Sequence, residues 1–147
     1  MDKREEILKR LAEVAGSVAG VSTVMRNTDE ISEHKRPAIA IFDADETADE
    51  RAMQQGHAGG APNLVEMTPE VVILLGSKPE SVGSKLNALR ASLIKAVLGD
   101  PQLISLTGPN GRVRYIGCST HLGHGRSMEG SMAVHFSFAY VLRPESL

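Results

Sequence analysis

The chain has 147 residues, of which 41% are hydrophobic, 23% charged and 3% aromatic. Sixteen basic and eighteen acidic residues give a formal net charge of -2 at pH 7, which disfavours a nucleic-acid-binding domain, because such domains are usually strongly basic. The single cysteine, Cys118, excludes an internal disulfide framework. No apolar run reaches the roughly 18 residues of a membrane span, and the charged start lacks the apolar stretch of a signal peptide. We therefore expect one soluble domain over residues 1–147, with no membrane partner.

The first predicted element is an amphipathic helix over residues 2–19. Asp2 is its expected N-cap, and Gly20 is expected to end it at the C′ position. Its apolar residues recur at steps of 4, 3 and 4, the spacing of one helix face: Ile7, Leu11, Val14 and Val18.

A second helix is predicted over residues 79–98, with Pro79 in its first turn and Gly99 after its last. A further helical turn is expected around residues 103–106, before the turn residues of GPNG. The apolar stripe of the long helix steps by 4, 3, 4 and 4: Val82, Leu86, Leu89, Leu93 and Val97.

Strands are predicted from alternating or continuous apolar residues at 21–25, 37–42, 64–75, 112–120 and 132–142. Pro69 should bend the third of these, because proline cannot donate to a ladder. Val71–Leu75 is continuously apolar, which predicts cover on both faces by helices or by another subunit. The fold class that follows is α+β, with a four- to five-stranded, mostly antiparallel sheet covered by two main amphipathic helices.

The last two predicted strands form a hairpin around the polar loop 121–129. Alternation places Val113 and Tyr115 on one side of the first strand, opposite Arg112 and Arg114. Four of the five aromatic residues lie on the hairpin, which predicts a small, localised aromatic core: Tyr115, Phe136, Phe138 and Tyr140.

Between residues 43 and 62 no periodicity is visible, and residues 46–62 are expected to be a flexible arm. Residues 43–50, which we call the acidic segment, hold five carboxylates: Asp43, Asp45, Glu46, Asp49 and Glu50. Several carboxylates suit a divalent cation, but the spacing matches no calcium loop. A solvated, self-repelling segment is therefore favoured over a metal site.

Two further groups of residues have side chains that metal binding or thiol catalysis would need. His121 and His124 are predicted to be surface loop histidines, since no nearby group completes a tetrahedral metal set. Thiol catalysis by Cys118 is disfavoured, because His121 would point to the opposite face of the strand and could not act as its base. A buried, inert cysteine is predicted instead.

Arg112 and Arg114 form a small basic stripe. One explanation is that their charges keep an exposed sheet edge soluble. The stripe is also complementary to the acidic segment, which permits head-to-tail association of copies into a ring. The candidate assembly contacts are therefore Asp43, Asp45, Glu46, Asp49, Glu50, Arg112 and Arg114.

Over nearly its whole length the chain resembles the tail terminator family of long-tailed bacteriophages, also called minor tail or tail-completion proteins. The resemblance rests on the order of elements and on four segments: VEMTPEVVILL, LNALRASLIKAVLGDPQL, GPNGRVRYIGCS and GRSMEGSMAVHFSFAYVLRP. It implies an α/β fold with helices packed on a sheet, no enzymatic activity and no cofactor.

The resemblance further implies a ring, typically hexameric, on the last disc of the tail tube. Such a ring stops tube polymerisation and presents a surface to the head-completion protein, and DNA passes through its bore. The subunit would be assembled in the bacterial host cytoplasm into the virion tail.

The sequence is also compatible with other functions. A different head–tail connector or completion protein would share these features. A small metal-dependent hydrolase would use Asp43, Asp45 and His57, or the pair His121 and His124. A monomeric RNA-binding domain conflicts with the charge and with the scarcity of aromatic residues.

Overall fold

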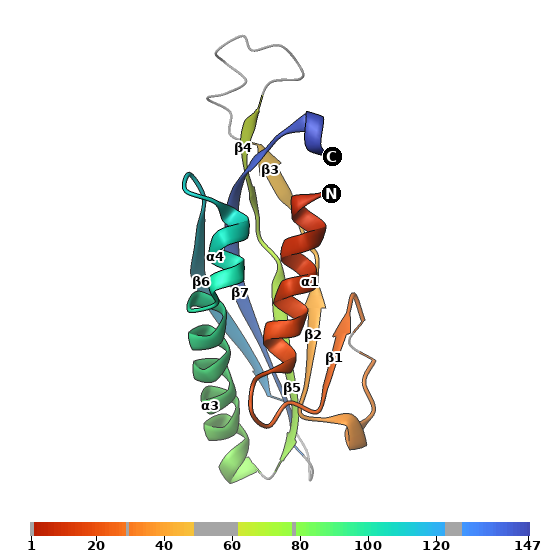
Figure 1. Cartoon of the computed structure of the whole chain (residues 1–147). Coiled ribbons are helices and arrows are strands. Elements are labelled where there is room, and N and C mark those ends of the chain that lie inside the picture. The colour runs from red at the N-terminus through yellow and green to blue at the C-terminus, as the bar shows by residue number, and fades with distance from the viewer. Residues whose placement is uncertain (1, 29, 49–61, 78, 123–127) are drawn as a thin grey trace.

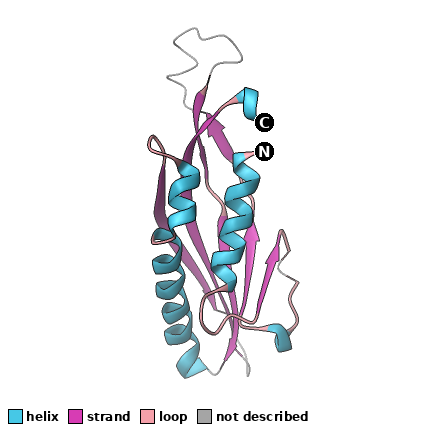
Figure 2. Ribbon diagram, in the orientation of Figure 1, coloured by secondary structure: helices cyan, strands magenta, loops and turns pink. Residues whose placement is uncertain are grey.

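The structure, a computed structural model, describes residues 2–28, 30–48, 62–77, 79–122 and 128–147. Within these ranges the three α-helices lie on one face of a seven-stranded, mostly antiparallel sheet (Figure 1, Figure 2). The predicted α+β class is thus confirmed. The elements follow the chain as α1 (Lys3–Gly16), β1 (Thr23–Arg26), a 3-10 turn (Glu33–Lys35), β2 (Ala38–Phe42), β3 (Glu46–Ala48), β4 (Asn63–Met67), β5 (Glu70–Ser77), α3 (Pro79–Leu98), α4 (Pro101–Thr107), β6 (Arg112–Leu122), β7 (Met128–Leu142) and a 3-10 turn (Pro144–Ser146).

The sheet is organised around β7, its longest strand. One side of β7 pairs with β6. The other side pairs first with β5 and then with β4, which lie end to end along it. Beyond β5 come β2 and then β1, the latter pair being parallel, and beyond β4 comes β3. The sheet therefore has a stepped edge, with β1 at one level and β3 at the other.

The predicted count of four or five strands is wrong, because the described residues form seven. The predicted strand 64–75 is interrupted at Thr68–Pro69, so that β4 and β5 take different neighbours. Pro69 has no N–H to donate, and its carbonyl accepts a hydrogen bond from the Phe136 amide at 3.4 Å. The second added strand is β3, which occupies the first residues of the predicted arm 46–62. Residues 49–61 of that arm lie outside the described residues.

The N-terminal helix is confirmed, but it is shorter than predicted. Asp2 is the N-cap, and its carboxylate accepts from the Arg4 amide at 3.0 Å. The helix ends at Gly16 rather than near Ala19, and the Ser17 amide closes its last turn on Glu13 and Val14 carbonyls. Gly20 instead lies beyond the helix with φ of 93°, a left-handed conformation that glycine adopts without a steric penalty.

The long helix α3 has the predicted bounds, and the further turn predicted near residues 103–106 is the helix α4. Asp100 caps α4, since its carboxylate accepts from the Leu103 amide at 2.9 Å. No helix in the described ranges is long and apolar enough to cross a membrane.

The main core lies between the helices and the sheet face beneath them. The predicted aromatic core is found there: Phe136, Phe138 and Tyr140 are at most 1% exposed, and the Tyr115 and Phe136 rings meet edge to face at 6.2 Å. It is joined by the helix stripes and by the inward residues of β2 and β5, including Ile7, Leu11, Leu86, Leu93, Ile39, Ile41, Val71 and Ile73.

We call the opposite side of the sheet the open face. The predicted second cover of Val71–Leu75 is partial: Val72 and Leu74 pack against a small cluster of Ile31, Ala38 and Ala40. Of these, Ile31 comes from the loop after β1, whereas Ala38 and Ala40 belong to the neighbouring strand β2. In the described ranges no α-helix lies on this face (Figure 1), and cover by another subunit stays a prediction. The rest of the open face carries charged side chains, among them Arg114 and Glu66.

Candidate assembly surface

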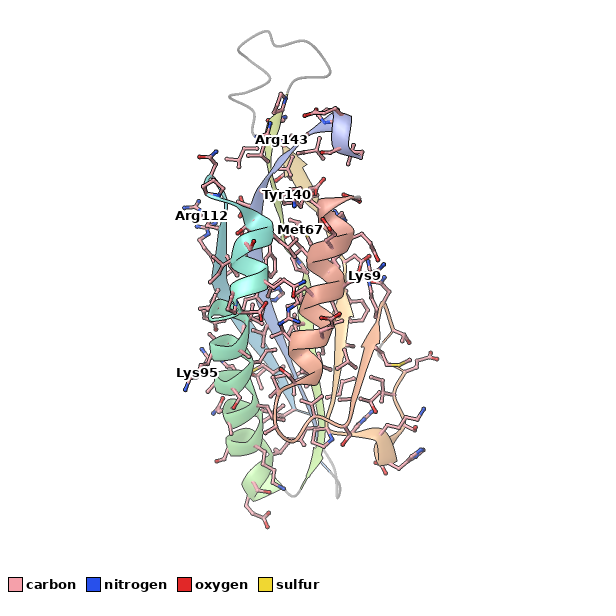
Figure 3. The ribbon with its side chains drawn as sticks, in the orientation of Figure 1. Lys9, Met67, Lys95, Arg112, Tyr140 and Arg143 are labelled. Atoms are coloured by element: carbon pink, nitrogen blue, oxygen red, sulfur yellow. The ribbon has the colours of Figure 1, made fainter. Side chains whose placement is uncertain are left out.

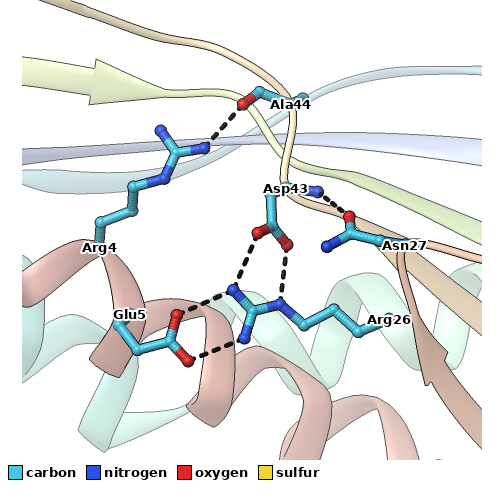
Figure 4. Close-up of polar contacts among 6 residues, drawn as sticks. All are labelled: Arg4, Glu5, Arg26, Asn27, Asp43 and Ala44. Atoms are coloured by element: carbon cyan, nitrogen blue, oxygen red, sulfur yellow. Dashed lines mark hydrogen bonds and ion pairs between the residues drawn. The ribbon is translucent and has the colours of Figure 1, made fainter.

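Asp43, the first residue of the acidic segment, belongs to an ion-pair network centred on Arg26 at the end of β1 (Figure 4). The guanidinium holds Asp43 through two hydrogen bonds of 2.8 and 2.9 Å and Glu5 of α1 through two of 2.9 Å. Hydrogen bonding to Arg26 lowers the pKa of both carboxyls. Asp43, predicted as a contact between copies, therefore already has an opposite charge within its own chain.

Neighbouring groups fix the backbone at this point (Figure 4). The Asp43 amide donates to Asn27 Oδ1 at 3.1 Å, and Arg4 donates to the Ala44 carbonyl at 2.7 Å. Ala44 has φ of 55°, in the left-handed region that non-glycine residues seldom occupy. These contacts turn the chain from β2 into β3 beside the start of α1.

The next acidic residues divide between the two faces. The Tyr140 hydroxyl donates to Glu46 on the helix side, and burial together with that carboxylate raises the pKa of Tyr140. Asp45 is exposed, and its carbonyl accepts from the Thr68 amide at 3.1 Å. Asp49 and Glu50 lie outside the described residues.

Arg112 and Arg114 lie on the open face at the outer edge of the sheet, as their alternation with Val113 and Tyr115 predicts. Arg114 donates to Glu66 of β4 at 3.1 Å, and the Ser137 hydroxyl between them donates to the same carboxylate. These hydrogen bonds, from Ser137 and then Arg114, lower the pKa of Glu66. Arg112 is exposed and projects from β6 (Figure 3).

Two of the hollows that described residues line lie on the open face. One of about 400 Å³ lies between the β6 and β3 edges and includes Arg112, Glu66 and Thr47 in its lining. The second, of about 490 Å³, mixes apolar and polar side chains: Phe42, Glu70, Val72, Ser119, His121, Ser131, Ala133 and His135. Both hollows are partly open to solvent, whereas small-molecule sites bury most of the surface of their ligand.

The residues that could bind a metal ion do not cluster in the described part of the chain. Among the described residues, no three His, Cys, Asp or Glu side chains come together to hold a metal ion. His121 belongs to strand β6 rather than to the predicted loop, while His57 and His124 lie outside the described residues.

Cys118 is exposed, so the predicted buried cysteine is wrong. A bulge between Tyr115 and Gly117 shifts the alternation of β6, and Cys118 pairs with Val134 on the helix side. Because β6 is an edge strand of the described sheet, its side chains are incompletely covered even on that side.

The sequence analysis did not single out Arg26, Glu66 or Ser137. Arg26 binds the candidate residue Asp43, and Glu66 accepts hydrogen bonds from the candidate residue Arg114 and from Ser137. A signal existed for Glu66, because its alternation with Val65 and Met67 places it on the open face. Nothing in the sequence connects Arg26 to Asp43 and Glu5.

Comparisons with known proteins identify no family. No family model matches the chain, and no curated protein matches it. Among solved structures, a chain described as "Virion of native gene transfer agent (GTA) particle" is 12% identical, with 92% of this chain and 90% of that chain covered and a TM-score of 0.44. Neither the identity nor the TM-score is high enough to assign the chain to a family.

Proposed function

We propose that this chain is a structural protein of a phage-like virion, a subunit of a tail terminator ring. The ring, a hexamer of identical copies, caps the tail tube, ends its polymerisation and offers a surface to the head-completion protein. DNA passes through the bore without specific binding. The subunit is made in the bacterial host cytoplasm and becomes part of the virion tail.

One observation carries this proposal. Arg112 and Arg114 lie at the β6 edge of the sheet, whereas Asp45 lies beside β3 at the opposite edge. Opposite charges on opposite edges of one subunit make it complementary to the next copy. Such a head-to-tail contact is heterologous, and it closes into a ring when the rotation per subunit permits.

The remaining candidate contacts have defined places in this scheme. Asp43 and Glu46 are held within the chain by Arg26 and Tyr140, so we assign them the role of fixing the acidic segment. Asp49 and Glu50 continue that segment in the sequence, and we propose them as further carboxylates facing the neighbouring copy.

The balance of charge also fits the proposal. Each phosphate that a protein neutralises adds affinity for DNA. A net charge of -2 therefore suits a subunit whose bore lets DNA move through.

The hydrolase alternative is not favoured by the geometry. Its first form needs the Asp43 carboxylate free to bind a metal, but both oxygens of that carboxylate accept hydrogen bonds from Arg26. His57 and His124 lie outside the described residues. This alternative also predicts tight binding of a divalent metal that Asp45→Ala abolishes, and isothermal titration with Mn²⁺ and Zn²⁺ measures this directly.

The test of the proposal is tube capping. Purified tail tube protein of the same virus is polymerised with and without this chain, and tube length is measured by negative-stain electron microscopy. We expect shorter tubes, each ending in a ring, and free rings at high concentration. Unchanged tube lengths with no terminal ring would contradict the proposal.

A further inference from the structure

Where β4 and β3 continue the sheet, its two edges are β6 and β3, and these two strands lie at the same level along the strand direction. Arg112 pairs with Ala139 of β7, Ala139 with Glu66 of β4, and Glu66 with Thr47 of β3. A single row of residues thus crosses the open face, from Arg112 at one edge to Thr47 at the other.

The adjacent row on the open face ends in opposite charges. Arg114 pairs with Ser137, and Thr68 follows Met67, the partner of Phe138, so Thr68 lies level with Ser137. The Thr68 amide donates to the Asp45 carbonyl. Arg114 and Asp45 therefore stand at the same level on opposite edges.

Strand direction is also compatible with a contact between copies. β3, β4, β7 and β6 are successively antiparallel, so a sheet continued from β6 to the β3 of a second copy stays antiparallel. Within the described sheet, the outer sides of β3 and β6 have no partner strand. Unpaired edges of this kind are templates for another strand.

The bulge limits the length of such a contact. Between Tyr115 and Gly117 the register of β6 shifts, which leaves Arg112–Tyr115 as the regular part of the edge at the level of β3. This matches the short β3, Glu46–Ala48.

We propose that β6 of one copy pairs antiparallel with β3 of the next copy, with Arg112 opposite Thr47 and Arg114 opposite Asp45. This inference rests on the proposed ring and specifies how its subunits meet. Arg114 keeps its bond to Glu66, because a guanidinium has five N–H donors and serves two carboxylates at once.

The test is a disulfide between copies. Arg112→Cys and Thr47→Cys are combined with Cys118→Ser in the full chain. Within one chain the two positions are three strand spacings, about 14 Å, apart, whereas a disulfide requires Cα atoms within about 7 Å. Any bond between the new thiols therefore joins two molecules.

The matched control combines Arg112→Cys with Met25→Cys in the same background. Met25 is an exposed residue of β1 on the same stepped edge as Thr47, but at the level of Ala40. After mild oxidation, we expect a ladder of covalent dimers and larger species on a non-reducing gel for the Thr47 pair and at least tenfold less for the Met25 pair.

The outcomes separate the two proposals. If the wild-type protein assembles but the Thr47 pair does not cross-link above the Met25 control, the strand pairing is overturned and the ring stands. If the wild-type protein remains monomeric and neither pair cross-links, both proposals fail.

A charge exchange provides a second test without oxidation. Arg114→Asp and Asp45→Arg should each weaken self-association about tenfold in sedimentation velocity, and combining them should restore most of it. Lys95→Asp, on an exposed part of α3 (Figure 3), is the control and should have no effect. Additive losses in the double variant would overturn the pairing of Arg114 with Asp45.

Discussion

Arg10 of α1 makes two hydrogen bonds to Asp100, the residue that caps α4. The distances are 2.9 Å from Nε to Oδ2 and 2.6 Å from an Nη to Oδ1. Asp100 also accepts from the Leu103 amide and is only 8% exposed. One carboxylate thus joins two helices ninety residues apart and fixes where α4 starts.

The first prediction concerns this cap. Asp100→Ala removes the acceptor for the α4 amide and leaves Arg10 without its partner, so we expect the free energy of unfolding to fall by roughly 2 kcal/mol. Urea denaturation followed by circular dichroism measures this. Asp100→Asn keeps a capping oxygen and should lose less than half as much, so equal losses in both variants would contradict the capping role.

The second prediction concerns pH. Asp43 has a pKa below its ordinary value of 3.8 because Arg26 hydrogen-bonds to it, and the Asp100 pKa is lowered in the same way by Arg10. A carboxyl with a lowered folded pKa stabilises the fold above its unfolded pKa, and this stabilisation is lost as the pH falls through the folded pKa. The urea midpoint should therefore decrease between about pH 5 and pH 2.

Asp43→Asn and Arg26→Gln test the cause of that decrease. Each should lower stability at pH 7 and flatten the acid part of the profile, because each removes the interaction that lowers the Asp43 pKa. A profile as steep as that of the wild type in both variants would show that this pair does not contribute to the pH dependence.

The third prediction compares two glycines. A Cβ at Gly111 would lie 2.1 Å from the Ala139 carbonyl oxygen and 2.2 Å from the Thr107 carbonyl oxygen, whereas at Gly117 it meets nothing within 4 Å. Gly111→Ala should destabilise the protein by roughly 2 kcal/mol or more, since backbone must move. Gly117→Ala should cost less than about 0.5 kcal/mol, and thermal unfolding of the two variants measures the difference.

The fourth prediction concerns Cys118. Since its side chain is exposed, it should react with a thiol reagent in the native protein within a few-fold of its rate in urea. Protection by a hundredfold or more would indicate a buried cysteine, as predicted for a lone, inert thiol. The release of thionitrobenzoate after addition of Ellman's reagent gives both rates.

The features that sequence predicted are those set by local chemistry. The stripe from Val82 to Val97 has helical spacing, and α3 has the predicted bounds. Alternation likewise placed Phe136 and Phe138 in the core, because side chains in a strand point to opposite faces.

The predictions that were wrong concern features that depend on contacts with residues far away in the sequence. Cys118 is exposed because β6 is an edge strand of the described sheet, and local sequence does not show which strand lies at an edge. The bulge itself has a local signal, since Gly117 interrupts the strand where the register shifts. The strand at Glu46–Ala48 exists through its pairing with β4 and the contact of Glu46 with Tyr140, neither of which is local. The ion pairs of the candidate site, such as Arg26 with Asp43 and Arg114 with Glu66, join residues far apart in the sequence. Their spacing therefore gives no sign that they meet.

In the proposed ring, copies of this chain associate head to tail. Native mass spectrometry of the full-length protein from 1 to about 50 micromolar tests it most directly, because a closed heterologous contact yields one discrete oligomer. We predict a hexamer that grows with concentration at the expense of the monomer, without a continuous series of larger species. A monomer that persists at the highest concentration, or a stable two-fold dimer that grows no further, would contradict the account.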